Sequence, residues 1–162
     1  MGSKHVTLRH EGGMRFVAAT TSGHEIVVDN AVGNGGPRPT ELVLAAIAGC
    51  TGMDVVEILA KKRQVVTGYR TEVSGEQRAE SPNVFLDIDV LHVVEGDVET
   101  EAVRRSIELS ATRYCTVSAQ LATGVATIHH RYRIVRPAGS ERPAEEEAIV
   151  IRTGPNLELS QA

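Results

Sequence analysis

Two cysteines, Cys50 and Cys115, are the residues of this sequence best suited to chemistry. A thiolate is a nucleophile and a metal ligand, and two thiols that meet in space can close a disulfide. Two cysteines are too few for the disulfide framework of a small secreted protein. On residue identity alone the simplest interpretation is two inert buried thiols, so their surroundings must decide.

Cys50 lies in a predicted helix over residues 39–63, which begins with a proline and carries Glu41 near its positive end. Helical spacing places Asp54 on the same face as Cys50. Burial raises the pKa of a thiol, and so does a neighbouring carboxylate, so an active Cys50 needs a nearby positive charge. That charge would have to be an arginine from another element or another subunit.

Cys115 lies between two further predicted helices, over residues 98–113 and 116–124. A thiol near the N-terminus of a helix ionises more readily, and Thr116 and Ser118 can satisfy the first-turn amides. The alternative is a small core residue at a helix junction. The residues alone leave both interpretations open.

The remaining predicted elements are strands rich in Val, Thr and Ile, separated by glycine turns. They lie over residues 4–10, 14–20, 24–29, 65–76, 84–94 and 125–135. The glycine-rich loop 30–38 is not a phosphate loop, because no Lys-Ser/Thr pair follows its glycines. The helix over 98–113 is expected to bury one stripe of side chains. That stripe is Val103, Ile107, Ala111 and Tyr114.

The composition changes after Arg136. We expect one domain over residues 1–137 and an acidic C-terminal tail over residues 138–162, in which Glu145 to Glu147 form a solvated run. Residues 148–152 are compatible with one added strand. Deletion of residues 138–162 is expected to leave a dimer of the protein largely intact. If residues 148–152 instead complete the sheet, the truncated protein is expected to be insoluble.

The overall composition excludes several classes of function. The chain of 162 residues has a net charge of −4, so it lacks the basic footprint of a nucleic-acid-binding protein. Its start has no apolar segment typical of a secretory signal. The longest uncharged stretch, residues 42–53, is shorter than the about 20 apolar residues that span a bilayer. We therefore expect a cytoplasmic protein that binds neither nucleic acid nor membrane.

Metal ligands do not show the usual local spacings. His129 and His130 are neighbours on a predicted strand, so their side chains point to opposite faces. The sequence has no Cys-x-x-Cys and no His-x-x-x-His pattern. We therefore expect neither a metal site nor a bound cofactor.

Two segments carry a resemblance to a known family. Pro39-Thr-Glu-Leu-Val-Leu-Ala-Ala-Ile-Ala-Gly-Cys50 is similar to the long central helix of the OsmC/Ohr superfamily, the osmotically inducible and organic hydroperoxide resistance proteins. Arg113-Tyr-Cys-Thr-Val-Ser118 resembles the second cysteine motif of that superfamily, usually Cys-Pro-Val-Ser. The order of elements over residues 4–135 matches as well. The sequence from Gly49 to Asp54 most resembles the YhfA-like branch.

This resemblance implies an α+β OsmC-like fold, with antiparallel sheets packed on a long central helix, in an intertwined homodimer. It implies a cysteine-based peroxidase of the antioxidant stress response that prefers organic hydroperoxides, uses a dithiol reductant and needs no cofactor. Cys50 would be the peroxidatic cysteine, which is oxidised to a sulfenic acid. Cys115 would be the resolving cysteine, which closes a disulfide.

Three positions depart from the family's pattern. Thr40 stands where its peroxidases usually carry the glutamate that holds the catalytic arginine, which leaves Glu41 as the neighbouring carboxylate. Thr116 replaces the usual proline. Asp54 opposes thiolate formation at Cys50 unless it is paired.

Arg15, which follows two glycines, resembles the family's catalytic arginine by position. The alternatives are that Arg15 is a solvated strand residue and that Arg38 is the cation. We predict Cys50, Cys115, Arg15 and Glu41 as the catalytic residues. The departures also keep a second function open. This is a binding or redox-sensing protein that retains the fold, turns over little and holds a small apolar ligand at the dimer interface.

Overall fold

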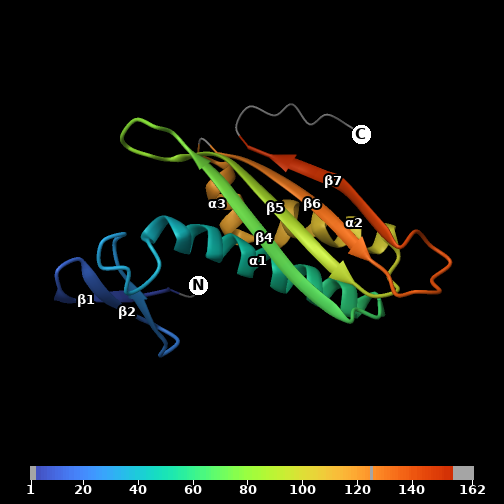
Figure 1. Ribbon diagram of the computed structural model, residues 1–162, viewed down its shortest axis with the longest axis horizontal. Coiled ribbons are helices and arrows are strands. Elements are labelled where there is room, and N and C mark those ends of the chain that lie inside the picture. Colours follow the sequence, from blue (N-terminus) through green and yellow to red (C-terminus); the bar gives the residue numbers. More distant parts are fainter. Residues whose placement is uncertain (1–2, 125, 155–162) are drawn as a thin grey trace. The chain divides into compact units, whose positions relative to one another are not determined.

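A computed structural model describes residues 3–124 and 126–154 of the chain (Figure 1). Its elements are β1 (Val6–Gly12), β2 (Arg15–Thr20), β3 (Glu25–Val28), α1 (Pro39–Lys61), β4 (Gly68–Gln77), β5 (Phe85–Glu95), α2 (Thr100–Leu109), η1 (Ser110–Tyr114), α3 (Thr116–Ala122), β6 (Thr127–Val135) and β7 (Glu145–Thr153). The chain divides into two compact units, residues 1–43 and 44–162. Each strand and helix expected from the sequence is present, with its ends shifted by a few residues.

The first unit holds a three-stranded antiparallel sheet in the order β1-β2-β3. Gly12 and Gly13 turn the chain between β1 and β2 with φ angles of 108° and 55°, a conformation that residues with a side chain rarely adopt. Several apolar side chains of this unit are exposed, Leu8 and Met14 among them, whereas Val17 and Ala18 of β2 are buried.

The second unit holds a four-stranded sheet in the order β4-β5-β6-β7 (Figure 1). Its outer pairs are antiparallel, but β5 and β6 run parallel, with Ile88 opposite Ile128. The expectation of purely antiparallel sheets is therefore wrong for this pair. Parallel neighbours require a long crossover connection, and α2, η1 and α3 form it.

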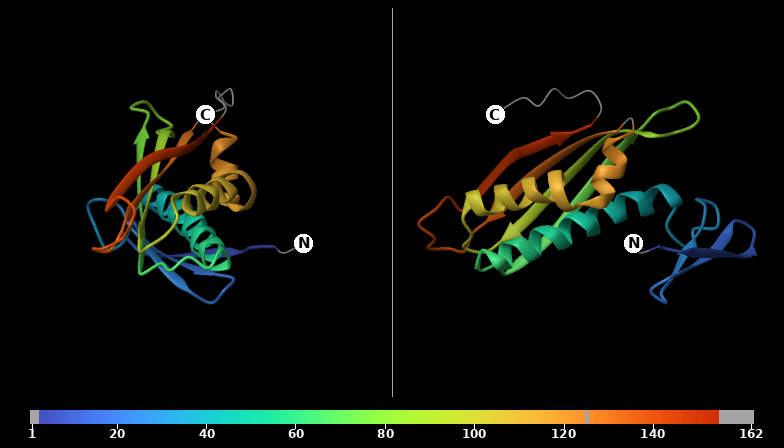
Figure 2. Two further views of the ribbon diagram at one scale, coloured as in Figure 1. Left: turned by 90° about the vertical axis from the view of Figure 1, so that its right-hand side faces the viewer. Right: turned by 180° about the vertical axis from the view of Figure 1, so that it is seen from behind.

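The helices α1, α2 and α3 lie on one face of this sheet (Figure 2). Alternation along the strands turns their aliphatic side chains toward the helices, where two clusters form the core. One cluster contains Val55, Leu59, Val94, Val98, Ala102, Val103, Ile107, Tyr132 and Ile134. The other contains Ile47, Ile88, Val90, Ala126 and Ile128. The core is thus almost wholly aliphatic.

A polar seam separates the two clusters. Along α1, Thr51 lies between a residue of one cluster and a residue of the other. His92 on β5 and His130 on β6 likewise lie between residues of the two clusters. These three side chains and Ser110 of η1 are fully buried. Burial of polar side chains is costly unless their atoms find hydrogen-bond partners. Apolar packing therefore does not account for the choice of residues in this seam.

The helix α1 has 23 residues and is long and apolar enough, by length and composition, to cross a membrane, a property that core helices of soluble proteins share. Its fully buried side chains Ile47, Val55 and Leu59 belong to the aliphatic clusters. Gly52 packs against β4, where an added Cβ would lie 3.1 Å from Thr71 Oγ1. α1 therefore holds one face against the sheet.

The helix α2 widens into the π-helical turn η1 directly before Cys115. Val103, Ile107 and Ala111 are buried, as their spacing predicts, but Tyr114 is 55% exposed. The expectation for Tyr114 is wrong, because a π turn holds more residues than an α turn and shifts the phase of the buried stripe.

The tail segment expected over residues 148–152 lies within β7, which pairs with β6. Glu146 accepts hydrogen bonds from Thr100, Tyr132 and Arg136. Glu147 forms ion pairs with two arginines of β6. The expectation of a solvated acidic run is therefore wrong for Glu146 and Glu147, because these two carboxylates pair with arginines of the second unit.

Candidate active site

The second unit brings the two cysteines together. The sulfur atoms of Cys50 and Cys115 and a carboxylate oxygen of Asp54 all lie within 4.8 Å of one another. Cys50 and Asp54 stand one turn apart on α1, and Cys115 comes from the junction of η1 and α3. Residues far apart in the sequence therefore form one cluster of two thiols and a carboxylate.

The two thiols differ in access to solvent. Cys50 is partly exposed, whereas Cys115 is 2% exposed. Burial raises the pKa of the Cys115 thiol to about 11, the hydroxyl and amide of Ser118 lower it in part, and the neighbouring Cys50 thiol raises it further. Cys115 is therefore a protonated thiol at neutral pH.

The position of Cys115 is fixed by local hydrogen bonds. It is the N-cap residue of α3, and its sulfur accepts hydrogen bonds from the amide and hydroxyl of Ser118 at 3.3 and 3.1 Å. Its own amide donates to the carbonyl of Ser110 at 2.8 Å. The expectation that Thr116 and Ser118 cap this helix is wrong, because the cysteine sulfur is the acceptor.

Asp54 is held by hydroxyl groups. Its Oδ2 accepts a hydrogen bond from the Ser110 hydroxyl at 2.9 Å, and Ser110 Oγ lies 2.9 Å from Thr51 Oγ1. Sequence reasoning found Asp54 from its spacing to Cys50 but missed Ser110, because no local pattern links residues of α1 and η1. The hydroxyl pair ties the carboxylate to the segment that precedes Cys115.

The predicted cation Arg15 lies in the first unit. Its Nε donates to Glu11 Oε2 at 3.1 Å, and its Nη1 donates to the carbonyl of Gly35 at 3.3 Å. Glu11 was not expected as a partner. A carboxylate does hold Arg15, therefore, but it is neither residue 40 nor Glu41.

Glu41 instead holds Arg38. Glu41 Oε2 accepts from the Arg38 amide at 2.8 Å, and the two side chains form an ion pair at 3.3 Å. The backbone amide of Arg38 is the main cause of the lowered pKa of Glu41. Glu41 thus holds Arg38, the alternative cation, and not Arg15, because it reaches back over the first turn of its own helix.

Asp29 immediately precedes the glycine-rich loop 30–38 and holds it by hydrogen bonds. Its carboxylate accepts hydrogen bonds from the amides of Gly35 and Asn30, which lower its pKa, and the charges of Arg15 and Arg38 lower it further. The glycines are needed here, because a Cβ at Gly35 would lie 2.7 Å from Arg15 Nη1. Sequence reasoning recognised the loop but not this carboxylate at its centre.

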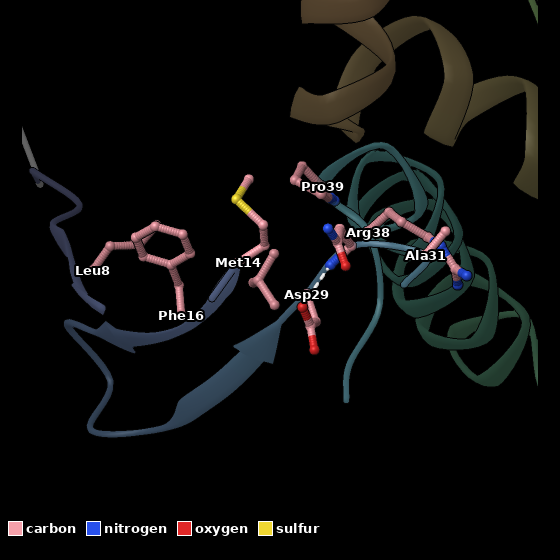
Figure 3. A pocket seen from close by; sticks show the side chains of 9 residues that line it. Leu8, Met14, Phe16, Asp29, Ala31, Arg38 and Pro39 are labelled. Carbon is pink, nitrogen blue, oxygen red and sulfur yellow. Dashed lines mark hydrogen bonds between the residues drawn. The ribbon is translucent and has the colours of Figure 1, made fainter. Parts of the chain in front are cut away.

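A pocket of about 350 Å³ opens in the first unit (Figure 3). Its lining is mainly apolar, with Leu8, Met14 and Phe16 on one side and Pro39 and Arg38 on the other. The guanidinium of Arg38 lies on the side away from Leu8 (Figure 3). The pocket thus combines an apolar wall with two charged groups, the Arg38 guanidinium and the Asp29 carboxylate.

Comparison with known proteins gives a consistent result. Residues 32–130 match the family described as OsmC-like protein. Protein YhfA of Escherichia coli (strain K12) is 40% identical over 124 residues, which cover 76% of this chain and 92% of YhfA. A hypothetical protein from Aquifex aeolicus VF5 is 30% identical, with a TM-score of 0.75 over 85% of this chain and 99% of the other. The organic hydroperoxide resistance protein OhrB of Bacillus subtilis has the same fold at 21% identity, with a TM-score of 0.56 over 81% of this chain and 98% of OhrB.

Proposed function

The chain belongs to the OsmC-like protein family, and from this premise we propose that it is a thiol peroxidase that reduces organic hydroperoxides. The observation that carries the proposal is the cluster in which the Cys50 and Cys115 sulfurs approach each other. The name of the OhrB protein, which shares the fold, supports the class of substrate.

The different access of the two thiols supports their roles. Cys50 is the partly exposed thiol, so a peroxide can reach it, whereas Cys115 is buried and protonated at neutral pH. Only a thiolate attacks a peroxide efficiently. Cys50 is therefore the peroxidatic cysteine of the proposal, and Cys115 reacts second.

The proposed reaction has three steps. The Cys50 thiolate attacks the terminal peroxide oxygen, so the O–O bond breaks, an S–O bond forms, and the alkoxide leaves and takes a proton to become an alcohol. The Cys115 sulfur then displaces hydroxide from the Cys50 sulfenic acid, and hydroxide leaves with the thiol proton as water. A dithiol reduces the resulting disulfide by exchange.

The positive charge for the Cys50 thiolate is proposed to come from Arg15. Glu11 and the Gly35 carbonyl hold this guanidinium, as a catalytic cation requires. Arg38 is the alternative cation, because its ion pair with Glu41 holds a second guanidinium in place. Substitution of Arg15 and of Arg38 by alanine distinguishes the two assignments of the cation.

We propose a homodimer as the working form. The face of α1 that is turned away from the sheet is apolar, built of small residues and methionine, and exposed. Its residues are Ala45, Ala46, Gly49, Met53, Val56 and Ala60. Small residues allow helices to approach closely, and a second copy presents the same stripe in a two-fold interface. Sedimentation that gives a monomer at micromolar concentration would contradict this.

The experiment that tests the function is steady-state consumption of tert-butyl hydroperoxide with a dithiol as reductant. We expect turnover by the wild type, slower turnover with hydrogen peroxide, and none above background for Cys50→Ser. Consumption that is equal in the wild type and in Cys50→Ser would exclude the peroxidase.

The second candidate function is binding of a small apolar ligand. The pocket of the first unit favours it, because its mainly apolar wall suits a ligand with an alkyl chain (Figure 3). Arg38 and Asp29 are the charged groups of the lining that can orient such a ligand. A fatty acid probe that binds the wild type and is lost in Met14→Glu, together with no peroxide turnover, would favour this function over the first.

A further inference from the structure

The cluster at the two cysteines also has the composition of a metal site. Among residues 3–124 and 126–154, it is the one group of three His, Cys, Asp or Glu side chains whose donor atoms lie as close as 4.8 Å. We propose that the reduced protein binds one zinc-like divalent cation through the thiolates of Cys50 and Cys115 and a carboxylate oxygen of Asp54. The sequence expectation of no metal site considered only local spacings, and this set joins two distant segments.

The donor types and their distances suit zinc. Zinc takes thiolate sulfur at about 2.3 Å and carboxylate oxygen at about 2.0–2.2 Å, so tetrahedral donors lie roughly 3.6–3.8 Å apart. The donors of the cluster are within 4.8 Å without a metal. Cys50 and Asp54 stand one turn apart on α1, which fixes two ligands on a rigid element. A modest rotation of the side chains therefore closes the site.

The surrounding hydrogen bonds already orient two of the ligands. The Ser110 hydroxyl donates to Oδ2 of Asp54 and so orients the carboxylate beside the two sulfurs. The amide and hydroxyl of Ser118 point at the Cys115 sulfur, where they stabilise a metal-bound thiolate. Hydrogen bonds of this kind fix the geometry of ligands in metal sites. Because Cys50 is partly exposed, water can reach the fourth position.

The charge of the cluster also favours a dication. In the described part of the second unit, the Cys115 sulfur accepts hydrogen bonds from the uncharged Ser118 and lies beside the Cys50 sulfur and the Asp54 carboxylate. In the complex, two thiolates and one carboxylate share the metal's two positive charges. Any proton on a ligand thiol passes to solvent, so metal binding releases protons.

Metal binding and oxidation exclude each other at this site. A sulfur in a disulfide is no longer a thiolate ligand, and a metal-bound Cys50 has its nucleophilic electron pair engaged. The cation would thus act as a reversible inhibitor that protects both thiols. This consequence rests on the proposed peroxidase, whereas the binding itself does not.

The test uses Co²⁺ as a spectroscopic probe for zinc on the full-length, reduced, chelator-treated protein without oxygen. We expect saturation at one ion per chain, an absorption band from thiolate-to-cobalt charge transfer, intense visible bands of a tetrahedral ion, and displacement by Zn²⁺. The same protein oxidised to the disulfide should bind no Co²⁺ in this way, which controls for the fold. Binding without the thiolate band, or only to surface carboxylates, would overturn the proposal.

Variants identify the ligands. Cys50→Ser and Cys115→Ser should lose the thiolate band in part and weaken binding, and Asp54→Asn should weaken it by roughly tenfold or more. Glu57→Gln is the matched control, because Glu57 lies on the same helix, is exposed and pairs with Lys61. Equal affinity of Asp54→Asn and wild type would contradict the carboxylate ligand. Loss of binding with normal peroxide turnover would leave the proposed function standing.

Discussion

The Ser110 hydroxyl donates a 2.9 Å hydrogen bond to Oδ2 of Asp54, a residue that lies one helical turn after Cys50 on α1. Among the described residues Asp54 makes no ion pair, so a neutral group orients the carboxylate beside the thiols. This contact gives Asp54 two opposite effects, since a carboxylate opposes a free thiolate and favours a metal-bound one.

The first prediction is that Asp54→Asn speeds the reaction of Cys50 with peroxide. Loss of one negative charge beside the sulfur should stabilise the thiolate and raise the second-order rate by about threefold to tenfold. Stopped-flow measurement with tert-butyl hydroperoxide at neutral pH gives the rate, with Glu57→Gln as control. A slower variant would show that Asp54 accepts the Cys50 proton instead.

The second prediction concerns the two arginines and their carboxylates. Arg15→Ala should lower the peroxide rate by roughly tenfold or more, because the Cys50 thiolate loses its cation. Glu11→Gln should follow Arg15→Ala in a weaker form, since Glu11 holds Arg15.

The matched pair is Arg38→Ala and Glu41→Ala, which disturb the other ion pair. We expect smaller losses from these two variants, and circular dichroism should show that all four proteins are folded. If Arg38→Ala and Glu41→Ala are the damaging pair, Arg38 is the cation and Arg15 is a structural residue.

Much of the fold was predictable because its signals are local. The periodicity of residues 39–63 and the glycine turns fix α1 and the strands of the first unit, and the spacing of Cys50 and Asp54 follows from a helix. The Ser110–Asp54 contact was not predictable, because it depends on a π turn that changes the phase of the chain before Cys115. The parallel pairing of β5 and β6 likewise depends on a crossover that no local pattern specifies.

The site was predictable in its thiols and not in its charges. Cys50 and Cys115 stand in motifs that resemble a family, so their meeting could be expected. Glu41 and Arg38 are neighbours in sequence, yet their pairing depends on how the first turn of α1 folds back. An exposed charged side chain can pair with several partners at nearly equal free energy, and the sequence alone does not rank these pairings.

The third prediction is a loss of stability in mild acid. Burial lowers the pKa of His92 to about 3, with a contribution from His130, and lowers the pKa of His130 to about 4. Both are neutral in the folded protein and become protonated near pH 6.5 in the unfolded chain. The free energy of unfolding should be unaffected by them above about pH 6.5 and should fall toward pH 4, by up to about 1.4 kcal/mol per pH unit for each histidine.

The test compares His130→Leu with wild type by chemical denaturation across this range. No hydrogen-bond partner is found among the described residues for either ring nitrogen of His130, so leucine should be tolerated at pH 7 and should flatten the acid dependence. His24→Gln, an exposed histidine, is the control and should not change the slope. An unchanged slope in His130→Leu would show that other groups cause the acid loss.

The fourth prediction is that residues 138–162 are not dispensable, contrary to the sequence expectation. Their removal deletes β7, whose Val150 packs against the core, and leaves the fully buried Arg136 side chain without Glu146. We expect truncation after residue 137 to give insoluble protein, and truncation after Gly154 to give soluble protein. Glu146→Gln should cost about 1–3 kcal/mol of unfolding free energy, and Glu147→Gln should cost little. A soluble, cooperatively folding 1–137 fragment would contradict this.

The central claim is that Cys50 and Cys115 react as a pair. Addition of about one equivalent of tert-butyl hydroperoxide to the reduced protein should give an intramolecular Cys50–Cys115 disulfide, seen by intact-mass analysis as a loss of two hydrogens. Cys115→Ser should instead gain oxygen at Cys50 and proceed to the sulfinic acid, and Cys50→Ser should leave Cys115 reduced. Over-oxidation of Cys115 in Cys50→Ser would reverse the two roles. Two thiols that remain reduced in the wild type would contradict the account.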